Sequence, residues 1–252
     1  MKNYREGSVI TATELKLNLG KYLDMAADKK DVVITKNNRK IARLTPYITD
    51  IESYFTAKEN AHDYVYGGKK VSYAEFMQIY EKSSERMEFI NGEIHLLASP
   101  SSFHQDILGY LYILFSGYFK GKPCKVYLAP FDVHFHKKGI SEPDVMQPDI
   151  TVACDYKTTI NEQGRYMGIP SLVLEILSPS TRSKDMVEKT NTYMLSGVKE
   201  YWIIDNNSKH IYIYSFKDFN VDNMQVYNIN ETAESFFFKG LQCETRELFE
   251  LE

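Results

Sequence analysis

Two short apolar runs in the second half of the chain predict buried β-strands, and an acid accompanies each of them. Residues 172–177 are apolar except for Glu175 in their middle, which is typical of a strand buried on both faces. Residues 150–153 form the second run, and Pro148 and Asp149 stand directly before it. A carboxylate in a sheet interior loses its hydration at a cost on the order of several kcal/mol unless a cation or donor compensates. We therefore expect Glu175 to have a partner.

A helix is predicted between residue 178 and a further strand at residues 200–205. It ends near Ser196, and it contains Asp185, Lys189 and Tyr193 at every fourth position. That spacing sets the three side chains along one helix face. The helix therefore presents an acid, a lysine and a hydroxyl group on the same side.

The rest of the second half alternates between shorter helices and strands. Asn91-Gly92 stands between two alternating apolar runs and predicts a β-hairpin over residues 86–97. A capping box at residues 72–75 predicts a helix to about residue 81. The other predicted elements are a longer helix that begins at residues 102–105 and strands at residues 125–129, 131–135 and 210–215. No element is predicted over residues 234–252, which mix aromatic and acidic side chains.

The start of the chain has a helical pattern followed by two strand-like runs. Thr11 and Glu14 fit a capping box, and apolar residues then recur at helical spacing as far as Ala26. Residues 31–35 and 40–45 are strand-like, and the asparagines between them tolerate a tight turn. This segment is therefore predicted to be a small α+β unit, a helix followed by a hairpin.

Length and composition fit one large domain and one small one. The chain has 252 residues, of which 43% are hydrophobic and 25% charged, as in an ordinary globular protein. A stretch with little periodicity runs from Ile48 to Lys70 and includes Gly67-Gly68. Residues 49–70 are therefore predicted to link a module of residues 1–48 to a domain of residues 71–252. No apolar run approaches the about 20 residues of a membrane span, and no secretory signal is expected at the N-terminus.

The three cysteines, Cys124, Cys154 and Cys243, are scattered along the chain. Their odd number and their spacing favour neither a disulfide framework nor a zinc site. We therefore expect reduced thiols and a cytoplasmic protein.

Charge is unevenly distributed between the two predicted parts. Residues 1–48 hold ten Lys/Arg and five Asp/Glu, whereas the remainder holds twenty basic and twenty-nine acidic residues. A basic module joined to an acidic domain indicates that the module contacts nucleic acid. The alternative is a dimerisation module whose basic residues are merely solvated.

Residues 11–20 and 32–44 together resemble the DNA-binding half of the Phd/YefM antitoxins. The resemblance implies a homodimer that pairs through this module and binds DNA through basic residues near the helix start. Lys16, Lys21 and Arg39 are the candidates. In that family a flexible tail after the module wraps a toxin partner, and this chain has a second predicted domain in its place.

The two acids and the lysine of the second half suit phosphodiester hydrolysis. That reaction uses a cation that polarises a phosphoryl oxygen and lowers the pKa of an attacking water. Mg²⁺ prefers oxygen ligands and binds few carboxylates, which fits Asp149 and Glu175 on neighbouring strands. A lysine stabilises the negative charge that develops. Lys189 is the candidate, with Asp185 as its partner on the helix and Tyr193 as a further donor.

The same residues resemble the Uma-two family of proposed restriction endonucleases, within the PD-(D/E)XK nuclease superfamily. The likeness covers about residues 70–215, and the matching motifs are Pro148-Asp149, residues 175–181, Asp185, Lys189, Tyr193 and residues 200–205, with residues 86–93 and 100–104 also matching. It implies an α/β (α+β) fold with a restriction-endonuclease-like mixed sheet flanked by helices. It also implies DNA cleavage dependent on Mg²⁺ or Mn²⁺.

Carried over from that family, Asp149 and Glu175 are expected to be metal ligands and Lys189 the catalytic lysine. Glu88 resembles a further acid of the family, which implies that it completes the shell of the metal ion. The common motif of the superfamily has a lysine two residues beyond the second acid, where this chain has Leu177. The resemblance therefore implies that the lysine comes from the following helix, with Tyr193 one turn further along.

Each candidate also has a structural interpretation. Asp149 could simply begin a strand after proline, Glu175 could be a structural buried acid, and Lys189 could pair with Asp185 on a solvated face. His104 suits a structural or an active-site role equally, and His134 and His136 are too few for a metal site. Asp144, in a second Pro-Asp pair, has no apolar strand behind it and is expected to have no role.

Two functions of different classes follow. The first is a metal-dependent DNA endonuclease fused to an antitoxin-like DNA-binding module. The second is a DNA-binding regulator or antitoxin whose nuclease-like domain is catalytically silent. A two-fold homodimer suits both the antitoxin resemblance and the cleavage of double-stranded DNA.

Overall fold

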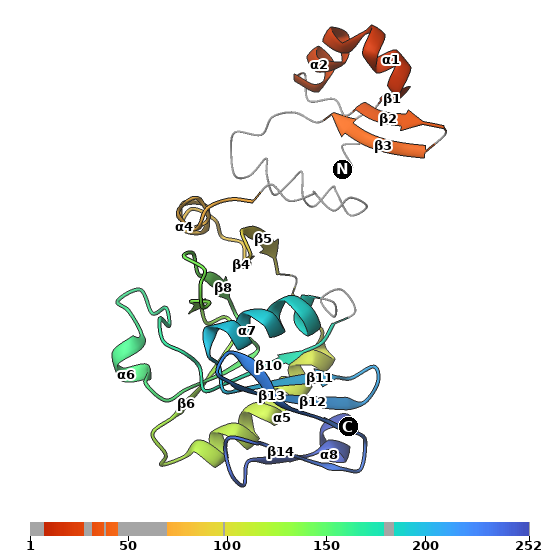
Figure 1. The fold of residues 1–252 in the computed structure, drawn as a ribbon. Helices are drawn as coiled ribbons and strands as arrows, with labels where there is room; N and C mark the ends of the chain where they lie inside the picture. Colours follow the sequence, from red (N-terminus) through yellow and green to blue (C-terminus); the bar gives the residue numbers. More distant parts are fainter. Residues whose placement is uncertain are drawn as a thin grey trace. The chain divides into compact units, whose positions relative to one another are not determined.

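The chain divides into two units, residues 1–67 and 68–252 (Figure 1). The computed structural model describes residues 8–27, 32–37, 39–44, 70–97, 99–178 and 184–251. The linker predicted over residues 49–70 lies outside the described residues, except for Lys70. None of the helices in the described ranges combines the length and the apolar character that crossing a membrane requires.

The first unit is a three-stranded sheet packed against two helices. Its elements are β1 (Ser8–Thr11), α1 (Ala12–Leu17), α2 (Leu19–Ala27), β2 (Val32–Lys36) and β3 (Arg39–Leu44). β2 is the central strand, parallel to β1 and antiparallel to β3. Ile10, Tyr22, Val32 and Ile34 form the buried core. The helical segment and the hairpin lie where the sequence predicts them, and β1 is an additional strand.

The predicted first helix is interrupted at Asn18. The Thr11 hydroxyl accepts a hydrogen bond from the Glu14 amide at 3.1 Å, as the capping box predicts. Asn18 leaves the helical backbone conformation, with φ −131° and ψ 37°, and its side-chain amide donates to the Glu14 carbonyl. Asparagine competes for backbone hydrogen bonds in this way and is therefore poor in helix interiors. The Glu14 carboxylate accepts from the Tyr22 hydroxyl of the second helix.

The second unit is built around a six-stranded sheet in the order β13-β12-β11-β10-β9-β6. The strands are β6 (Lys125–Leu128), β9 (Ile150–Ala153), β10 (Leu172–Ile176), β11 (Glu200–Asp205), β12 (His210–Lys217) and β13 (Asn220–Tyr227). β10 and β11 are parallel, and the other neighbours are antiparallel. The middle strands are apolar at most positions because both faces of the sheet are covered.

Helices cover the two faces of this sheet. On one face α5 (Ser102–Phe119) and α8 (Thr245–Phe249) pack against side chains such as Leu174 and Trp202. On the other face α7 (Thr190–Ser196) packs through Tyr193 against Val173 and Tyr201. Figure 1 shows α5 and α7 on opposite sides of the strands.

A second, four-stranded sheet has the order β5-β4-β8-β7. Its strands are β4 (Met87–Ile90), β5 (Glu93–Leu96), β7 (Val133–Phe135) and β8 (Asp144–Met146), and α4 (Tyr73–Tyr80) packs on it. Ile90, Phe135 and Met146 of this sheet join the core beneath α7. The predicted mixed α+β class, with sheets flanked by helices, is therefore confirmed for this unit.

Several elements differ from the sequence prediction. β8, β13, β14 (Thr232–Glu234), β15 (Gln242–Glu244), α6 (Tyr156–Thr159) and α8 were not predicted. The predicted helix at residues 102–105 begins at Ser102, and its cap is Ser101, whose hydroxyl accepts from the His104 amide. The predicted helix after residue 178 is in fact a π-helical turn, Lys184–Lys189, followed by α7.

The expectation of reduced cysteines is wrong for one pair, since Cys124 and Cys154 form a disulfide. β6 pairs antiparallel with β9, with Lys125 opposite Ala153, so the two cysteines are the next pair along the same ladder. A separation of 30 residues conceals this pairing in the sequence. Cys243 is free and buried. The cysteines therefore do not support a cytoplasmic location.

Candidate active site

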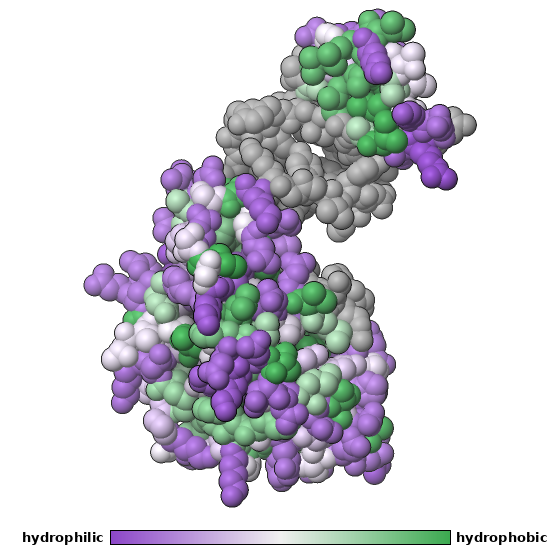
Figure 2. Space-filling model, in the orientation of Figure 1, coloured by the Kyte–Doolittle hydropathy of each residue, from purple (hydrophilic) through white to green (hydrophobic). Residues whose placement is uncertain are grey.

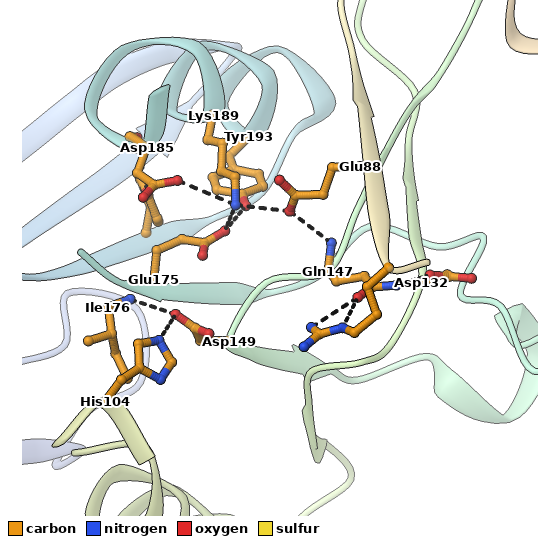
Figure 3. A network of polar contacts seen from close by, with 12 residues as sticks. Glu88, His104, Asp132, Gln147, Asp149, Glu175, Ile176, Asp185, Lys189 and Tyr193 are labelled. Atoms are coloured by element: carbon orange, nitrogen blue, oxygen red, sulfur yellow. Dashed lines mark hydrogen bonds and ion pairs between the residues drawn. The ribbon is translucent and has the colours of Figure 1, made fainter. Parts of the chain in front are cut away.

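Asp149 and Glu175 belong to the neighbouring ends of β9 and β10 in the large sheet. β9 and β10 are antiparallel with Thr151 opposite Val173. The same register continued by one pair of same-face positions sets Asp149 opposite Glu175. In Figure 3 the Asp149 carboxylate turns toward the Ile176 amide and His104, whereas the Glu175 carboxylate turns toward Lys189 and Tyr193.

Lys189 points inward from the end of the π-helical turn and lies among three carboxylates. Its Nζ is 2.7 Å from Glu175 Oε1, 3.0 Å from Glu88 Oε1 and 3.4 Å from Asp185 Oδ1. Only 5% of the Lys189 side chain is exposed. The alternative of a Lys189–Asp185 pair on a solvated face is therefore wrong.

Tyr193 completes the contacts of Glu175 from the first turns of α7. Its hydroxyl donates to Glu175 Oε1 at 2.6 Å, the same oxygen that Lys189 contacts. Asp185, Lys189 and Tyr193 thus reach one site, although the first two belong to a π-helical turn and not to a regular α-helix. π-helical turns inside helices are frequent at functional sites.

Glu88 joins the cluster from β4, in the smaller sheet. Its Oε1 accepts the backbone amide of Gln147 at 3.2 Å in addition to its contact with Lys189. The Gln147 side chain in turn accepts from Arg86 and donates to Asp132. Figure 3 shows this polar chain running from Lys189 through Glu88 to Gln147 and Asp132. The two sheets are therefore linked at the site.

Negative charge exceeds positive charge in the cluster. Burial raises the pKa of Glu175, Lys189 acts against that rise, and the carboxylates of Asp185, Asp149 and Glu88 add to it. For Lys189, burial favours the neutral form, but the attraction of Glu175, Glu88 and Asp185 outweighs it and raises the pKa well above the ordinary value. Lys189 is therefore a charged ammonium among more acids than it can neutralise.

The donors suit a hard divalent cation that keeps much of its water. Across the described ranges, no three His, Cys, Asp or Glu side chains form a ready-made metal cage. Mg²⁺ commonly binds only one or two carboxylates, and Asp149 and Glu175 supply two on adjacent strands. The Thr151 hydroxyl, beside Asp149 on the same face, is buried and has no hydrogen-bond partner among the described residues. An unsatisfied buried oxygen and an excess of carboxylates are what a hydrated cation would compensate.

His104 also belongs to this site. Its Nε2 lies 3.2 Å from Asp149 Oδ2, and the backbone amide of Ile176 donates to the same oxygen at 2.8 Å. Both contacts are visible in Figure 3. In the sequence, only its position near a helix start marks His104 as a candidate. Its contact with Asp149 could not be predicted, because it depends on the packing of α5 against the sheet.

Asp144, expected to have no role, is a buried structural acid at the head of β8. It accepts from Lys137 Nζ at 2.6 Å, from the Thr192 hydroxyl at 2.7 Å and from the Asn91 amide at 2.8 Å. Only the absence of a strand behind Asp144 was predicted wrongly, because β8 has only three residues. The contact with Thr192 attaches α7, which bears Tyr193, to the smaller sheet.

The other candidates lie apart from these contacts or in the first unit. His134 is buried and lies 3.1 Å from the Tyr73 hydroxyl, with burial lowering its pKa to about 4. His136 is exposed. The basic candidates of the first unit, Lys16, Lys21 and Arg39, are all exposed on its surface.

Comparison with known proteins points to one family. The model of the Uma2 family, described as "Putative restriction endonuclease", matches residues 73–246, which is more than half of the chain. Two uncharacterized proteins of Synechocystis sp. are similar: one is 27% identical over 150 residues, the other 29% identical over 139 residues. The matches cover 59% and 54% of this chain and 76% of each relative.

A solved structure has a similar fold. The crystal structure of a "putative nuclease belonging to DUF820" from Anabaena variabilis superimposes with a TM-score of 0.59 at 18% sequence identity. The similarity covers 71% of this chain and 97% of that one. The two proteins therefore share a fold over most of this chain.

Proposed function

The chain belongs to the Uma2 family, described as "Putative restriction endonuclease", and we propose that it is a divalent-metal-dependent endonuclease that cleaves phosphodiester bonds of DNA. The observation that carries the proposal is the buried ammonium of Lys189. It lies 2.7 Å from Glu175 and 3.0 Å from Glu88, and the carboxylate of Asp149 is near enough to act on the pKa of Glu175. A cation-binding acid pair beside a buried lysine is the chemistry that phosphodiester hydrolysis uses.

Asp149 and Glu175 are the residues that would hold Mg²⁺ or Mn²⁺. When bound, the ion polarises a phosphoryl oxygen and lowers the pKa of a bound water. The excess negative charge of the cluster supports this role, because a divalent cation offsets it. The donor atoms of Asp149 and Glu175 also support it, because both residues offer only oxygen ligands, which hard cations prefer.

Lys189 stabilises the negative charge that develops on the phosphoryl group. Burial strengthens this effect, because an ammonium interacts more strongly in a site with little water. Glu88 and Asp185 contact the ammonium at 3.0 and 3.4 Å and fix its position. Tyr193 fixes Glu175 through its 2.6 Å hydrogen bond. In this proposal Glu88 and Tyr193 orient the groups that meet the substrate.

The first unit would add DNA binding. We propose that it acts as a Phd/YefM-like module that dimerises and contacts DNA through Lys16, Lys21 and Arg39. Their exposure and the excess of basic residues in residues 1–48 support this. A toxin partner would need a surface other than the flexible tail that antitoxins of that family use.

One observation favours a second function, a DNA-binding regulator with a silent nuclease-like domain. Lys189 already contacts three carboxylates, so part of the negative charge is balanced without a metal ion. A site that remained in this arrangement would hold the domain together and would not cleave DNA.

A plasmid-nicking assay separates the two functions. Supercoiled DNA is incubated with the full chain in Mg²⁺, in Mn²⁺ and in EDTA, with Glu175→Ala and Lys189→Ala as test variants. Lys157→Ala is the matched control, because Lys157 is exposed on α6. We expect metal-dependent nicking by the wild type and by the control, and a loss of at least about 100-fold in the two test variants.

Two results would contradict the nuclease. Equal nicking by all four proteins would indicate a contaminant or a different site. A folded wild type that cleaves neither DNA nor RNA would favour the regulator.

A further inference from the structure

His104 and Asp149 form a pair at the edge of the proposed active site. His104 Nε2 lies 3.2 Å from Asp149 Oδ2, and each side chain is 16% exposed. The histidine is held in place from its own backbone, because its amide donates to the Ser101 hydroxyl that caps α5. The backbone of His104 is therefore fixed in the first turn of α5, and its ring extends to Asp149 before β9.

The contacts define which nitrogen of the ring donates. A carboxylate only accepts hydrogen bonds, so Nε2 must bear the proton that faces Asp149. Nδ1 is buried and has no hydrogen-bond partner in the described part of the chain. A buried N–H without an acceptor is costly, so the arrangement suits a ring with its proton on Nε2 and a bare Nδ1.

Both donors to Asp149 end on the same oxygen. Ile176, the residue after Glu175 on β10, donates its backbone amide to Asp149 Oδ2 at 2.8 Å, and His104 donates to that oxygen too. Asp149 Oδ1 has no such bond among the described residues. Two donors on one oxygen fix the plane of the carboxylate and leave the other oxygen for another ligand.

We propose that His104 is a positioning residue, which orients Asp149 so that its second oxygen binds the divalent cation together with Glu175. The inference rests on the proposed function. Residues that hydrogen-bond a metal-ligating carboxylate typically change metal affinity about 10- to 100-fold when they are removed. A purely structural role, in which His104 only attaches α5 to β9, predicts a change in stability and none in metal affinity.

The test measures Mn²⁺ binding to the full chain by isothermal titration calorimetry, with the melting temperature of the metal-free protein measured alongside. His104→Phe keeps the ring and removes the donor, and His104→Gln restores an N–H near the position of Nε2. His136→Phe is the matched control, because His136 is exposed in the same unit. Asp149→Asn reports whether the measured ion is bound at this site.

We expect His104→Phe to weaken Mn²⁺ binding by about 10-fold or more. His104→Gln should recover most of the affinity, and His136→Phe should bind like the wild type. Asp149→Asn should bind no Mn²⁺ in the measured range. Should His104→Phe fail to fold, His104→Asn takes its place, since its shorter amide remains polar but ends short of Asp149.

Different failures have different meanings. Wild-type affinity in His104→Phe, with a lower melting temperature, would leave His104 a structural link and overturn this inference while the metal site stands. Mn²⁺ binding that survives Asp149→Asn would place the ion elsewhere and overturn it too. A wild type that binds no Mn²⁺ would remove the metal-dependent function and, with it, the role of His104.

Discussion

The second unit contains two buried acid–lysine pairs with nearly the same geometry. Asp144 and Lys137 are 2.6 Å apart, and Glu175 and Lys189 are 2.7 Å apart, with side chains almost wholly buried in both pairs. Both pairs lie next to α7. Distance and burial alone therefore do not distinguish a structural pair from a candidate active site.

The two pairs differ in how their charges are balanced. Asp144 meets one ammonium and two neutral donors, the Thr192 hydroxyl and the Asn91 amide. Lys189 instead contacts three carboxylates. A balanced, hydrogen-bonded pair needs nothing more, whereas an excess of buried acids is costly until a cation compensates it. Charge imbalance is thus the feature that marks the functional cluster.

The largest expected effect is on stability, at the balanced pair. Asp144→Ala leaves the Lys137 ammonium buried without its carboxylate, and it should lower the free energy of unfolding by about 3–5 kcal/mol. Urea unfolding measures this, with the exposed Asp106→Ala as control. A loss below about 1 kcal/mol would mean that this pair contributes little to stability, which would contradict its structural role.

Divalent cations should stabilise the unbalanced cluster alone. At a concentration 100 times its Kd, a bound ion adds about 2.7 kcal/mol to the free energy of unfolding. We expect Mn²⁺ to raise the melting temperature of the wild type, EDTA to reverse the rise, and Glu175→Gln to abolish it. An equal rise in Glu175→Gln would show that the ion binds outside this cluster.

The pH dependence of stability is the next largest expected difference between the Glu175–Lys189 cluster and the Asp144–Lys137 pair. Burial raises the pKa of Glu175 from 4.5 to about 8. The folded state therefore holds this proton more tightly than the unfolded chain, so the contribution of Glu175 is complete below about pH 4.5 and is lost as the pH rises through about 8. Without metal, Glu175→Gln should gain stability relative to the wild type between about pH 5 and 9. A constant difference across that range would contradict the raised pKa.

The smallest expected effect is that of a single hydroxyl group. Tyr193→Phe removes the hydrogen bond to Glu175 and should cost about 1 kcal/mol of stability, together with a severalfold loss of cleavage. Tyr201→Phe is the matched control, because its hydroxyl donates to the Asp185 carbonyl and not to a site acid. Equal cleavage by both variants would leave Tyr193 without a role in orienting Glu175.

Sequence patterns were sufficient for the parts of the fold with strong local signals. Glu175 stands out as the one acid of an apolar run, and Asp149 directly precedes another such run, so both strands follow from the apolar pattern. Asn91-Gly92 gives the β4–β5 hairpin for a similarly local reason. The recurrence of Asp185, Lys189 and Tyr193 at every fourth residue correctly predicted that they share one face, even though the turn that bears Lys189 is π-helical.

Other features depend on contacts between distant segments and have little local signal. Asp144 precedes a strand of three residues, too short for a periodic pattern, and its partners Lys137 and Thr192 come from elsewhere in the chain. Cys124 and Cys154 meet only through the β6–β9 register. The contact of His104 with Asp149 likewise needs the packing of α5 against the sheet.

The most direct test of the charge-imbalance account is the rate of plasmid cleavage in Mn²⁺ by Glu175→Gln and Asp144→Asn, each expressed per folded molecule. The account predicts that Glu175→Gln loses at least about 100-fold, whereas Asp144→Asn, once corrected for unfolded protein, cleaves nearly as fast as the wild type. Comparable losses in both variants, or full activity in Glu175→Gln, would contradict it.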